Sequence, residues 1–510
     1  MTTITLRAVA DINWHNVQAI AYDHADVILD PGSLAAVHDG RERFVRAIEA
    51  GLPCYGVSTG LGKFVERNVA DSDDPAFVAN ILRARAVAIG PPLPRAVSRG
   101  ALVLKLTNFL SGMDGVRPAL CEYMVARLND GLTPWIPSYG HGMAADATAN
   151  GHVFQTLAGE GFVWSGDGTR GSAHDALRRY GADPYIPDRK EALALINGIA
   201  VTPAYALDAH RRLSTLLATA NCVAASSIVA AALPMDSIDA AVGDVSAARG
   251  VADVIKHLQH VVSAHDRRPH KLQAPVSFRI VPQVHGACSD ALHDLRQRIE
   301  ECFCSFSDNP MLVENHQGER KFLSVGVFHN QHLVNQIDHV ALAIAHIAAL
   351  SERRLHRLLD ADVTGLSPQL AIRPGLDVGL VVAHKAALES IARIKFLAQP
   401  VSLHTGESSG GQEDYMSMAI PAIARLYEML QSIRQILAAE LLAILVALDQ
   451  RAPPTASHTA AVHTCARRYV QKMTGDRATG ADTEALLKLF DSEEWQALSS
   501  CDMSASVLSD

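Results

Sequence analysis

The chain has 510 residues, of which 48% are hydrophobic and only 5% aromatic, and its formal net charge is −9. This length is ample for two or three structural regions with a large core. The mildly acidic balance and the absence of a long lysine or arginine run argue against nucleic acids and anionic membranes as partners.

The cysteines and the first residues of the chain indicate the cellular compartment of the protein. The eight cysteines form no C-x-x-C pair, and Cys302 and Cys304 are separated by Phe303 alone, which is not a zinc spacing. Free thiols in a reducing compartment fit this usage. The opening stretch MTTITLRAVADINWHN lacks a basic segment followed by an apolar one, so we see no secretion signal. We therefore expect a cytoplasmic protein.

An apolar stretch at residues 213–235, LSTLLATANCVAASSIVAAALPM, is the segment most similar to a membrane span. It is dominated by small residues and contains Asn221, Ser226 and Ser227. A buried helix that packs closely against its neighbours suits this composition better than a helix facing lipid. We expect a soluble protein.

Helical periodicity dominates along the chain. Residues 311–325 are the exception, because they read as a β-hairpin with its turn at 315–318. Residues 333–360 predict a helix about seven turns long, with one apolar stripe and a basic last turn. The stripe is formed by Leu333, Ile337, Val340, Ile344 and Ile347. Residues 426–448 are apolar nearly all round, which predicts a helix buried in a large bundle or an oligomer core.

These patterns predict a mainly all-α fold with a long central helical bundle and a short β-hairpin. Pro453 and Pro454 mark a break before a more polar segment. The chain is therefore expected to divide into an N-terminal domain at 1–200, a central helical-bundle domain at 201–452 and a C-terminal helical segment at 453–510.

Four short segments carry residues suited to chemistry. They are YGVSTGLGKF at 55–64, KEALALINGIA at 190–200, VSFRIVPQVHGA at 276–287 and SSGGQEDYMSMA at 408–419. Each has an ordinary structural explanation when it is taken singly. A glycine-rich turn is usually only a turn, an arginine near a helix start usually forms a surface ion pair, and acidic residues after two glycines usually cap a helix.

Taken together, eight motifs follow the order found in one family. They are YGVSTGLG (55–62), GVRP (115–118), LNDGLTPWIP (128–137), LAGEG (157–161), EALALING (191–198), SDNP (307–310), SERR (351–354) and QEDYMSM (412–418). In this respect the chain resembles the aromatic amino acid ammonia-lyases, above all histidine ammonia-lyase. The resemblance implies a mostly α-helical homotetramer around a long helical bundle, with active sites shared between subunits. A fold does not settle a function, however.

The resemblance also locates a missing reagent. In the family an Ala-Ser-Gly triplet cyclises and dehydrates into an electrophile, the methylidene-imidazolone group. Met143, Ala144 and Ala145 stand in its place here, followed by the expected Asp146. Ala144 has no hydroxyl to eliminate, and Ala145 has a Cβ where glycine eases the backbone attack. The nearest alternative triplet, at 147–149, lacks the glycine and is out of register. We expect no cofactor.

This loss suggests the type of substrate. The electrophile activates an amino group, which is a poor leaving group, by capturing its lone pair. A quaternary ammonium has no lone pair to capture, and it departs unaided as a neutral tertiary amine. One such activity among relatives of histidine ammonia-lyase is elimination of trimethylamine from ergothioneine, the betaine of 2-thiohistidine, to give thiourocanate. A cofactor-free lyase or isomerase acting on another histidine betaine or amino acid stays open, as does a non-catalytic homologue.

The resemblance assigns roles to individual residues. Tyr55 matches the family's catalytic tyrosine and is expected to remove the β-proton, with its anion favoured by a nearby cation or backbone amides. Arg279 matches the arginine that binds the substrate carboxylate, which a planar guanidinium can clamp through two hydrogen bonds. Asn197 matches an asparagine close to the reacting centre and could help to hold that carboxylate.

Glu413 falls at the family's glutamate near the substrate ring, and Gln412 precedes it in the same motif. Lys385 interrupts an apolar helical stretch where related lyases carry a small or apolar residue. Such a lysine often extends to solvent. The functional hypothesis is that Lys385 and Glu413 bind the thioimidazole and act as the acid partner of Tyr55.

Several positions depart from histidine ammonia-lyase and weaken any claim to ordinary histidine deamination. Arg85 stands where that enzyme has a histidine contacting the substrate ring, and Ser58 replaces an asparagine in the Tyr55 motif. Both are candidate substrate-binding residues. Val276 falls at a second active-site tyrosine, and Val327 replaces another asparagine.

We predict no metal site. Five histidines lie in or near the segments of interest, namely His141, His152, His285, His329 and His404. None of them forms H-E-x-x-H or a comparable cluster, so structural roles are expected for most of them. The expected partners are a small betaine substrate and further copies of this chain, and neither a nucleic acid nor a membrane.

Overall fold

The computed structural model describes residues 2–67, 75–262, 269–314, 316–317, 319–451 and 457–500. Helices dominate these residues, which confirms the predicted mainly all-α class. The chain forms two compact units. The first contains Met1–Asp208, Arg296–Asn335 and Pro400–Ala424, and the second contains Ala209–Leu295, Gln336–Gln399 and Arg425–Asp510. The expected division into three consecutive segments stays a prediction, and its boundary at Pro453 lies outside the described residues.

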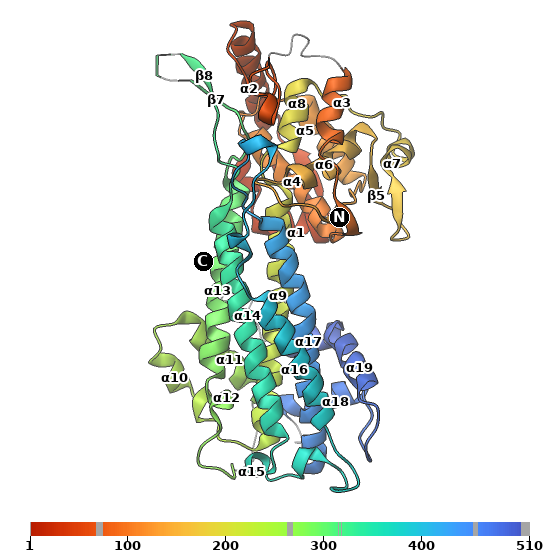
Figure 1. The fold of residues 1–510 in the computed structure, drawn as a ribbon, viewed down its shortest axis with the longest axis vertical. Coiled ribbons are helices and arrows are strands. Elements are labelled where there is room, and N and C mark those ends of the chain that lie inside the picture. The colour runs from red at the N-terminus through yellow and green to blue at the C-terminus, as the bar shows by residue number, and fades with distance from the viewer. Residues whose placement is uncertain are drawn as a thin grey trace. The chain divides into compact units, whose positions relative to one another are not determined.

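The first unit is built from short and medium helices around α4. Its helices are α1 (Trp14–Tyr22), α2 (Pro31–Glu49), α3 (Pro75–Arg83), α4 (Arg95–Leu110), α5 (Pro118–Asn129), α6 (Ala147–Phe154), α7 (Ala173–Arg179) and α8 (Arg189–Ile196) (Figure 1). Every residue of α4 from 97 to 110 is buried, although Arg99, Lys105 and Asn108 are polar. This helix therefore brings polar groups into the core of the unit.

Four two-stranded sheets occur among the described residues. They are β1 (Thr3–Leu6) with β2 (Asp26–Leu29), β3 (Ile89–Pro92) with β4 (Pro137–Tyr139), β5 (Phe162–Trp164) with β6 (Arg170–Ser172), and β7 (Met311–Glu314) with β8 (Arg320–Leu323). Only β1 and β2 are parallel. The β7–β8 pair is the predicted hairpin. Asn315 and Gly318 of its predicted turn lie outside the described residues.

Long helices supply most of the second unit. The remaining helices of the chain are α9 (Val201–Ala231), α10 (Ala240–Asp244), α11 (Arg249–Val262), α12 (Val276–Arg279), α13 (Val281–Cys304), α14 (Gln331–Leu358), α15 (Ala361–Thr364), α16 (Val381–Leu397), α17 (Ala419–Arg451), α18 (His458–Arg467), α19 (Gly480–Phe490) and α20 (Glu493–Ser499). The helices predicted at 333–360 and 426–448 correspond to α14 and α17. The predicted helix at 213–235 corresponds to α9, which ends earlier, because Ala232 has φ +50°.

A buried carboxylate ties three of these helices together. Glu440 of α17 accepts hydrogen bonds at 2.5 Å from Ser227 of α9 and at 2.5 Å from Ser351 of α14. Arg354 of α14 adds two more, at 2.7 and 3.0 Å. Both charged side chains are fully buried. Because each charge is paired and hydrogen-bonded, this contact fixes the register of the bundle helices.

Three stretches are long and apolar enough to cross a membrane, by length and composition alone. They are Arg189–Ala231, Gln331–Leu358 and Ala419–Arg451. The most apolar windows of these stretches are 83%, 56% and 78% buried inside the protein, respectively. Packing within a helical bundle accounts for apolar residues at such positions.

Candidate active site

Tyr55 lies in a tight turn after α2, and its hydroxyl has a defined partner. The Gly62 backbone N–H donates a hydrogen bond to the Tyr55 oxygen at 2.9 Å. Gly56 has φ +71°, and a Cβ there would approach Leu193 of α8 to 2.9 Å. A side chain at this position would therefore push the turn away from α8. The amide contact fixes the position of the Tyr55 oxygen.

Ser58 stabilises this turn through hydrogen bonds to the Cys54 backbone. Its hydroxyl accepts a hydrogen bond from the Cys54 N–H at 2.8 Å and lies 3.3 Å from the Cys54 carbonyl. Cys54 is fully buried, and burial raises the pKa of its thiol to about 12. The Ser58 hydroxyl is thus used by the turn, and its role in substrate binding stays a prediction.

Residues 143–145 form a bend between β4 and α6. The Ala144 carbonyl accepts a hydrogen bond from the Ser417 hydroxyl at 3.3 Å, and the Thr148 hydroxyl contacts the Met143 sulfur at 2.7 Å. Only a methyl group projects from Ala144, so the residues do not fit the family's electrophile, whose methylidene requires a hydroxyl to eliminate.

Asp146 holds this bend against the start of α9. Its carboxylate accepts hydrogen bonds from the Ala200 N–H at 2.9 Å and from the Thr202 N–H at 2.7 Å. The Thr202 hydroxyl adds a third at 2.5 Å. Asp146 is buried, and burial raises its pKa despite these donors. The bend is therefore anchored by a residue outside the triplet itself.

Asn197 lies at the carboxyl end of α8. It is the C-cap residue, with extended backbone angles. Its carbonyl accepts hydrogen bonds from Lys105 Nζ at 2.5 Å and from Asn150 Nδ2 at 3.2 Å. Its side-chain amide donates to the Asn309 carbonyl at 2.6 Å. Both the backbone and the side chain of Asn197 are therefore fixed.

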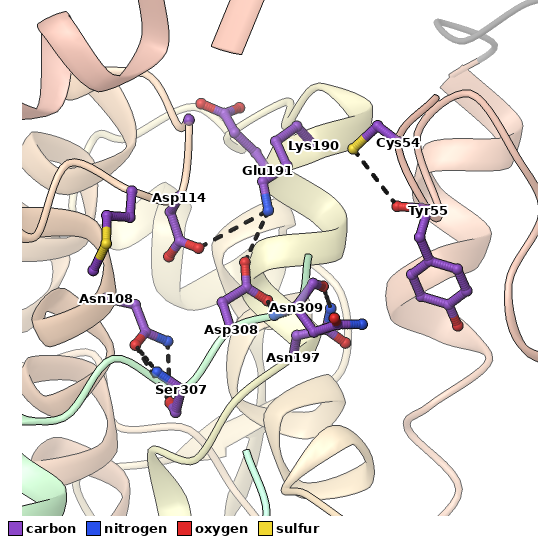
Figure 2. Close-up of polar contacts among 12 residues, drawn as sticks. Cys54, Tyr55, Asn108, Asp114, Lys190, Glu191, Asn197, Ser307, Asp308 and Asn309 are labelled. Atoms are coloured by element: carbon purple, nitrogen blue, oxygen red, sulfur yellow. Dashed lines mark hydrogen bonds and ion pairs between the residues drawn. The ribbon is translucent and has the colours of Figure 1, made fainter. Parts of the chain in front are cut away.

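A cluster of buried charges adjoins Asn197, and we call it the buried charge cluster: Lys105, Asp114, Lys190 and Asp308. Lys190 Nζ lies 2.8 Å from an Asp308 oxygen and 3.9 Å from an Asp114 oxygen (Figure 2). Burial and the neighbouring Asp308 raise the pKa of Asp114 well above its usual range. Burial also disfavours the charge on Asp308, but Lys190 and its other partners outweigh that effect and lower its pKa. The pKa values of the two carboxyl groups are therefore shifted in opposite directions.

The loop that carries Gln412 and Glu413 lies against the Tyr55 turn. A Cβ on Gly62 would approach the Ser409 hydroxyl to 2.5 Å. The backbones of Ser408 and Glu413 exchange hydrogen bonds at 2.8 and 3.3 Å. Gln412 is exposed and Glu413 is half-buried. Helix α17 begins only at Ala419, so these residues do not cap a helix.

Arg85 follows α3 and is half-buried. A Cβ on Gly151 of α6 would lie 2.7 Å from the Arg85 Cβ. Helix α6 begins directly after Asp146, so the backbone at Arg85 lies against the helix that follows the 143–145 bend. Whether its guanidinium contacts a substrate stays a prediction.

Arg279 and Lys385 belong to the second unit. Arg279 ends α12, and its Nε donates to the Ala274 carbonyl at 2.9 Å. It lines a cleft of about 690 Å³ together with Gln283. Lys385 lies on α16 with an exposed side chain. The roles assigned to both residues stay predictions.

Most of the five histidines have structural partners. His141 Nε2 lies 2.6 Å from the Pro137 carbonyl, and His285 Nδ1 lies 2.7 Å from an Asn221 oxygen. His152 accepts the Ala88 N–H at 3.0 Å, and burial lowers its pKa to about 4. The His329 ring packs 5.7 Å from that of Tyr415, and His404 is exposed. No group of three metal-binding side chains occurs within the part of the chain that the structure describes.

The first unit thus brings together four of the predicted segments: the Tyr55 turn, the 143–145 bend, Asn197 and the 412–413 loop. Sequence reasoning missed the buried charge cluster. Lys105 is the one charged residue in the mostly apolar run ALVLKLTNFL, and such an isolated charge in a helix was an available signal. Lys190 and Asp308 lie within or next to motifs quoted for the resemblance, but neither was assigned a role.

Comparisons with known proteins agree on the family. The signature described as aromatic amino acid lyase matches residues 12–468. The chain is 32% identical over 474 residues to histidine ammonia-lyase from Geobacillus thermodenitrificans, covering 92% of this chain and 93% of that one. It is 34% identical over 451 residues to histidine ammonia-lyase from Geobacillus kaustophilus, covering 86% and 88%.

Solved structures share the fold. Ergothionase from Treponema denticola, in complex with desmethyl-ergothioneine sulfonic acid, superposes with a TM-score of 0.91 at 21% identity, covering 97% of this chain and 99% of that one. Tyrosine aminomutase from Streptomyces globisporus gives a TM-score of 0.87 at 26% identity, covering 98% of each chain. The chain belongs to the aromatic amino acid lyase family.

Proposed function

We propose that this protein is a carbon–nitrogen lyase that needs no methylidene-imidazolone group and eliminates trimethylamine from ergothioneine to give thiourocanate. One observation carries the proposal. The Tyr55 turn is intact and its hydroxyl is bonded by the Gly62 amide, while Ala144 stands where the electrophile would form. The site therefore keeps a base and lacks the group that activates a primary amine. The fold shared with Treponema denticola ergothionase supports this choice.

The reaction requires one proton transfer and one bond cleavage. The ionised Tyr55 oxygen takes the β-proton, and the electron pair of that C–H bond becomes the second bond between Cα and Cβ. The C–N electron pair leaves with nitrogen, which departs as neutral trimethylamine. The Gly62 N–H donates to the Tyr55 oxygen and holds it in place for the transfer.

The remaining residues bind the substrate and spread its charge. In this proposal Arg279 clamps the carboxylate through paired hydrogen bonds, with Asn197 nearby. Lys385 and Glu413 hold the thioimidazole, which receives electron density as the β-proton leaves. Arg85, Ser58 and Gln412 complete the proposed substrate contacts.

We further propose a cytoplasmic homotetramer with sites shared between subunits. Helix α16, which carries Lys385, exposes apolar side chains in the single chain: Val382 is 60% exposed, Leu388 43% and Phe396 77%. Apolar groups of this size gain free energy when a second subunit covers them. A single protomer would then not contain every residue of the site.

Incubation with two substrates tests the proposed activity. We expect ergothioneine to yield trimethylamine and a conjugated product that absorbs in the ultraviolet, and histidine to yield no urocanate. Conversion of histidine alone, or of another histidine betaine in preference to ergothioneine, would replace the proposed substrate. A protein whose melting temperature rises with either ligand while neither is consumed is a binding homologue rather than an enzyme.

Substitution of Arg279 tests the carboxylate clamp. We expect Arg279→Lys to raise KM for ergothioneine about 10-fold or more, because lysine cannot form the paired hydrogen bonds. The matched control is Arg249→Lys, a half-exposed arginine on α11 of the same unit. Steady-state kinetics decides: an unchanged KM for Arg279→Lys removes this residue from the site.

A further inference from the structure

We propose that Lys105 is a positioning residue for Asn197 and that the buried charge cluster holds Asn197 in its place beside the reacting groups. The catalytic part of this inference rests on the proposed function, while the structural part does not. Nothing in the chemistry described above uses Lys105, Asp114, Lys190 or Asp308, although all four are buried.

Lys105 acts on the Asn197 backbone. Its side chain is 1% exposed and rises from the centre of α4 between the rings of Phe109 and Phe154, at 5.7 and 5.8 Å from their centroids. Its ammonium donates a hydrogen bond to the Asn197 carbonyl at 2.5 Å. This carbonyl is at the end of α8, where no intrahelical donor is available to it. Lys105 therefore fixes the point at which the chain leaves the helix.

The other end of the cluster acts on the Asn197 side chain. Asp308 is paired with Lys190 at 2.8 Å, and its second oxygen accepts the Asn309 N–H at 2.7 Å. The Asn309 carbonyl then accepts the Asn197 amide at 2.6 Å. The same residue receives the Val325 N–H on its side-chain oxygen at 2.7 Å. The cluster thus holds Asn197 at two points: Lys105 binds its backbone carbonyl, and Asp308 acts through Asn309 on its side-chain amide.

Helix α8, which carries Lys190 of the cluster, also contacts the Tyr55 turn. Burial raises the pKa of Cys54, the residue before Tyr55, and the charge of Lys190 opposes this effect. Arg189, the neighbouring residue on α8, donates to the Gly56 carbonyl at 3.2 Å. Helix α8 therefore connects the turn that carries the base with the end that carries Asn197. Displacement of Asn197 by a fraction of an ångström would change its distance to the reacting atoms.

Lys105→Met is the variant of choice. Methionine is apolar, flexible and similar in length, and it packs well between aromatic rings such as those of Phe109 and Phe154. The change leaves the Lys190–Asp308 ion pair in place. We therefore expect a folded protein in which the Asn197 carbonyl has lost its charged donor.

The matched control is Arg99→Met on the same helix. Arg99 is also buried, and it donates to backbone carbonyls at Ile20 and Leu128, at 3.1 and 3.2 Å. It makes none of the contacts to Asn197. We expect both variants to lower the melting temperature, and only Lys105→Met to lower kcat for ergothioneine, by about 10- to 100-fold. KM should change less than threefold.

A double-mutant cycle separates positioning from general destabilisation. In an Asn197→Ala background, Lys105→Met should lower kcat by less than twofold, while its effect on the melting temperature should be the same as in the parent. Equal kcat losses in both backgrounds would show that Lys105 acts by another route. If Lys105→Met yields no folded protein, Asn150→Ala replaces it, because Asn150 donates to the same carbonyl.

Hydrogen exchange gives a second measurement that needs no activity. Exchange of a peptide spanning residues 197–202 should quicken in Lys105→Met and stay at the parent rate in Arg99→Met. Unchanged exchange overturns the inference whatever the kinetics show. A parent protein that leaves ergothioneine intact would overturn the proposed function alone, and the exchange comparison would still decide whether Lys105 positions Asn197.

Discussion

Replacing Tyr55 with phenylalanine should lower kcat for ergothioneine by at least about 10²- to 10⁴-fold, the usual contribution of a placed general base. The substitution removes only the hydroxyl, and the ring can keep its place in the turn. The Gly62 N–H loses its partner at 2.9 Å, but its neighbours in the turn remain. Trimethylamine release under saturating substrate measures the effect.

The control for this variant is Tyr469→Phe, which removes the hydroxyl of a 39% exposed tyrosine after α18. Its turnover should equal that of the parent, and the melting temperatures of both variants should lie within a few degrees of the parent value. If Tyr55→Phe turns over ergothioneine near the parent rate, the base must be another group, and the parallel with the family tyrosine fails.

Lys385→Met and Glu413→Gln should each lower kcat by about 10²- to 10⁴-fold while weakening the binding of thiourocanate much less. The reason is that both groups are proposed to act on charge that develops in the thioimidazole only as the β-proton leaves. The product has no such charge. Turnover kinetics and product titration, performed on the same preparations, give the two quantities to compare.

Two neighbouring residues provide matched controls. Lys395 is a second exposed lysine on α16, and Glu407 is an exposed glutamate in the same loop as Glu413. Lys395→Met and Glu407→Gln should leave kcat near the parent value. Parent-like turnover by Lys385→Met would show that Lys385 is an ordinary surface lysine, and the acid partner of Tyr55 would have to be sought elsewhere.

The fold could be predicted from the sequence where one periodicity extends over many turns. Two predicted helices were confirmed as α14 and α17: the apolar stripe at 333–360 and the segment at 426–448 that is apolar nearly all round. In segments this long, the hydrophobic periodicity outweighs the conformational preferences of single residues. The three unpredicted strand pairs contain strands of only three or four residues, and none lies in a segment that reads as a hairpin in the way that 311–325 does. Tertiary contacts, rather than a repeating pattern, create pairs of that length.

The site was predictable only in part, for a different reason. The Tyr55 turn could be recognised from its glycines. Gly56 and Gly62 have positive φ angles, which favour glycine, so the need for this backbone conformation is visible in the sequence. The buried charge cluster could not, because Lys105 and Asp308 are distant in sequence and only the folded core brings them together. The sequence likewise does not show that α8 ends at Asn197, or that Lys105 binds the Asn197 carbonyl at the helix end.

The anchoring of residues 143–145 bears on how a family can exchange one chemistry for another. Asp146 binds the Thr202 N–H at the start of α9, Ser417 binds the Ala144 carbonyl, and Thr148 contacts Met143. None of these contacts depends on a cyclised triplet. A lineage could therefore lose its electrophile through single substitutions at 143–145 and still inherit a shaped pocket. Selection for a substrate whose leaving group needs no activation could then act on a protein that had kept its fold throughout.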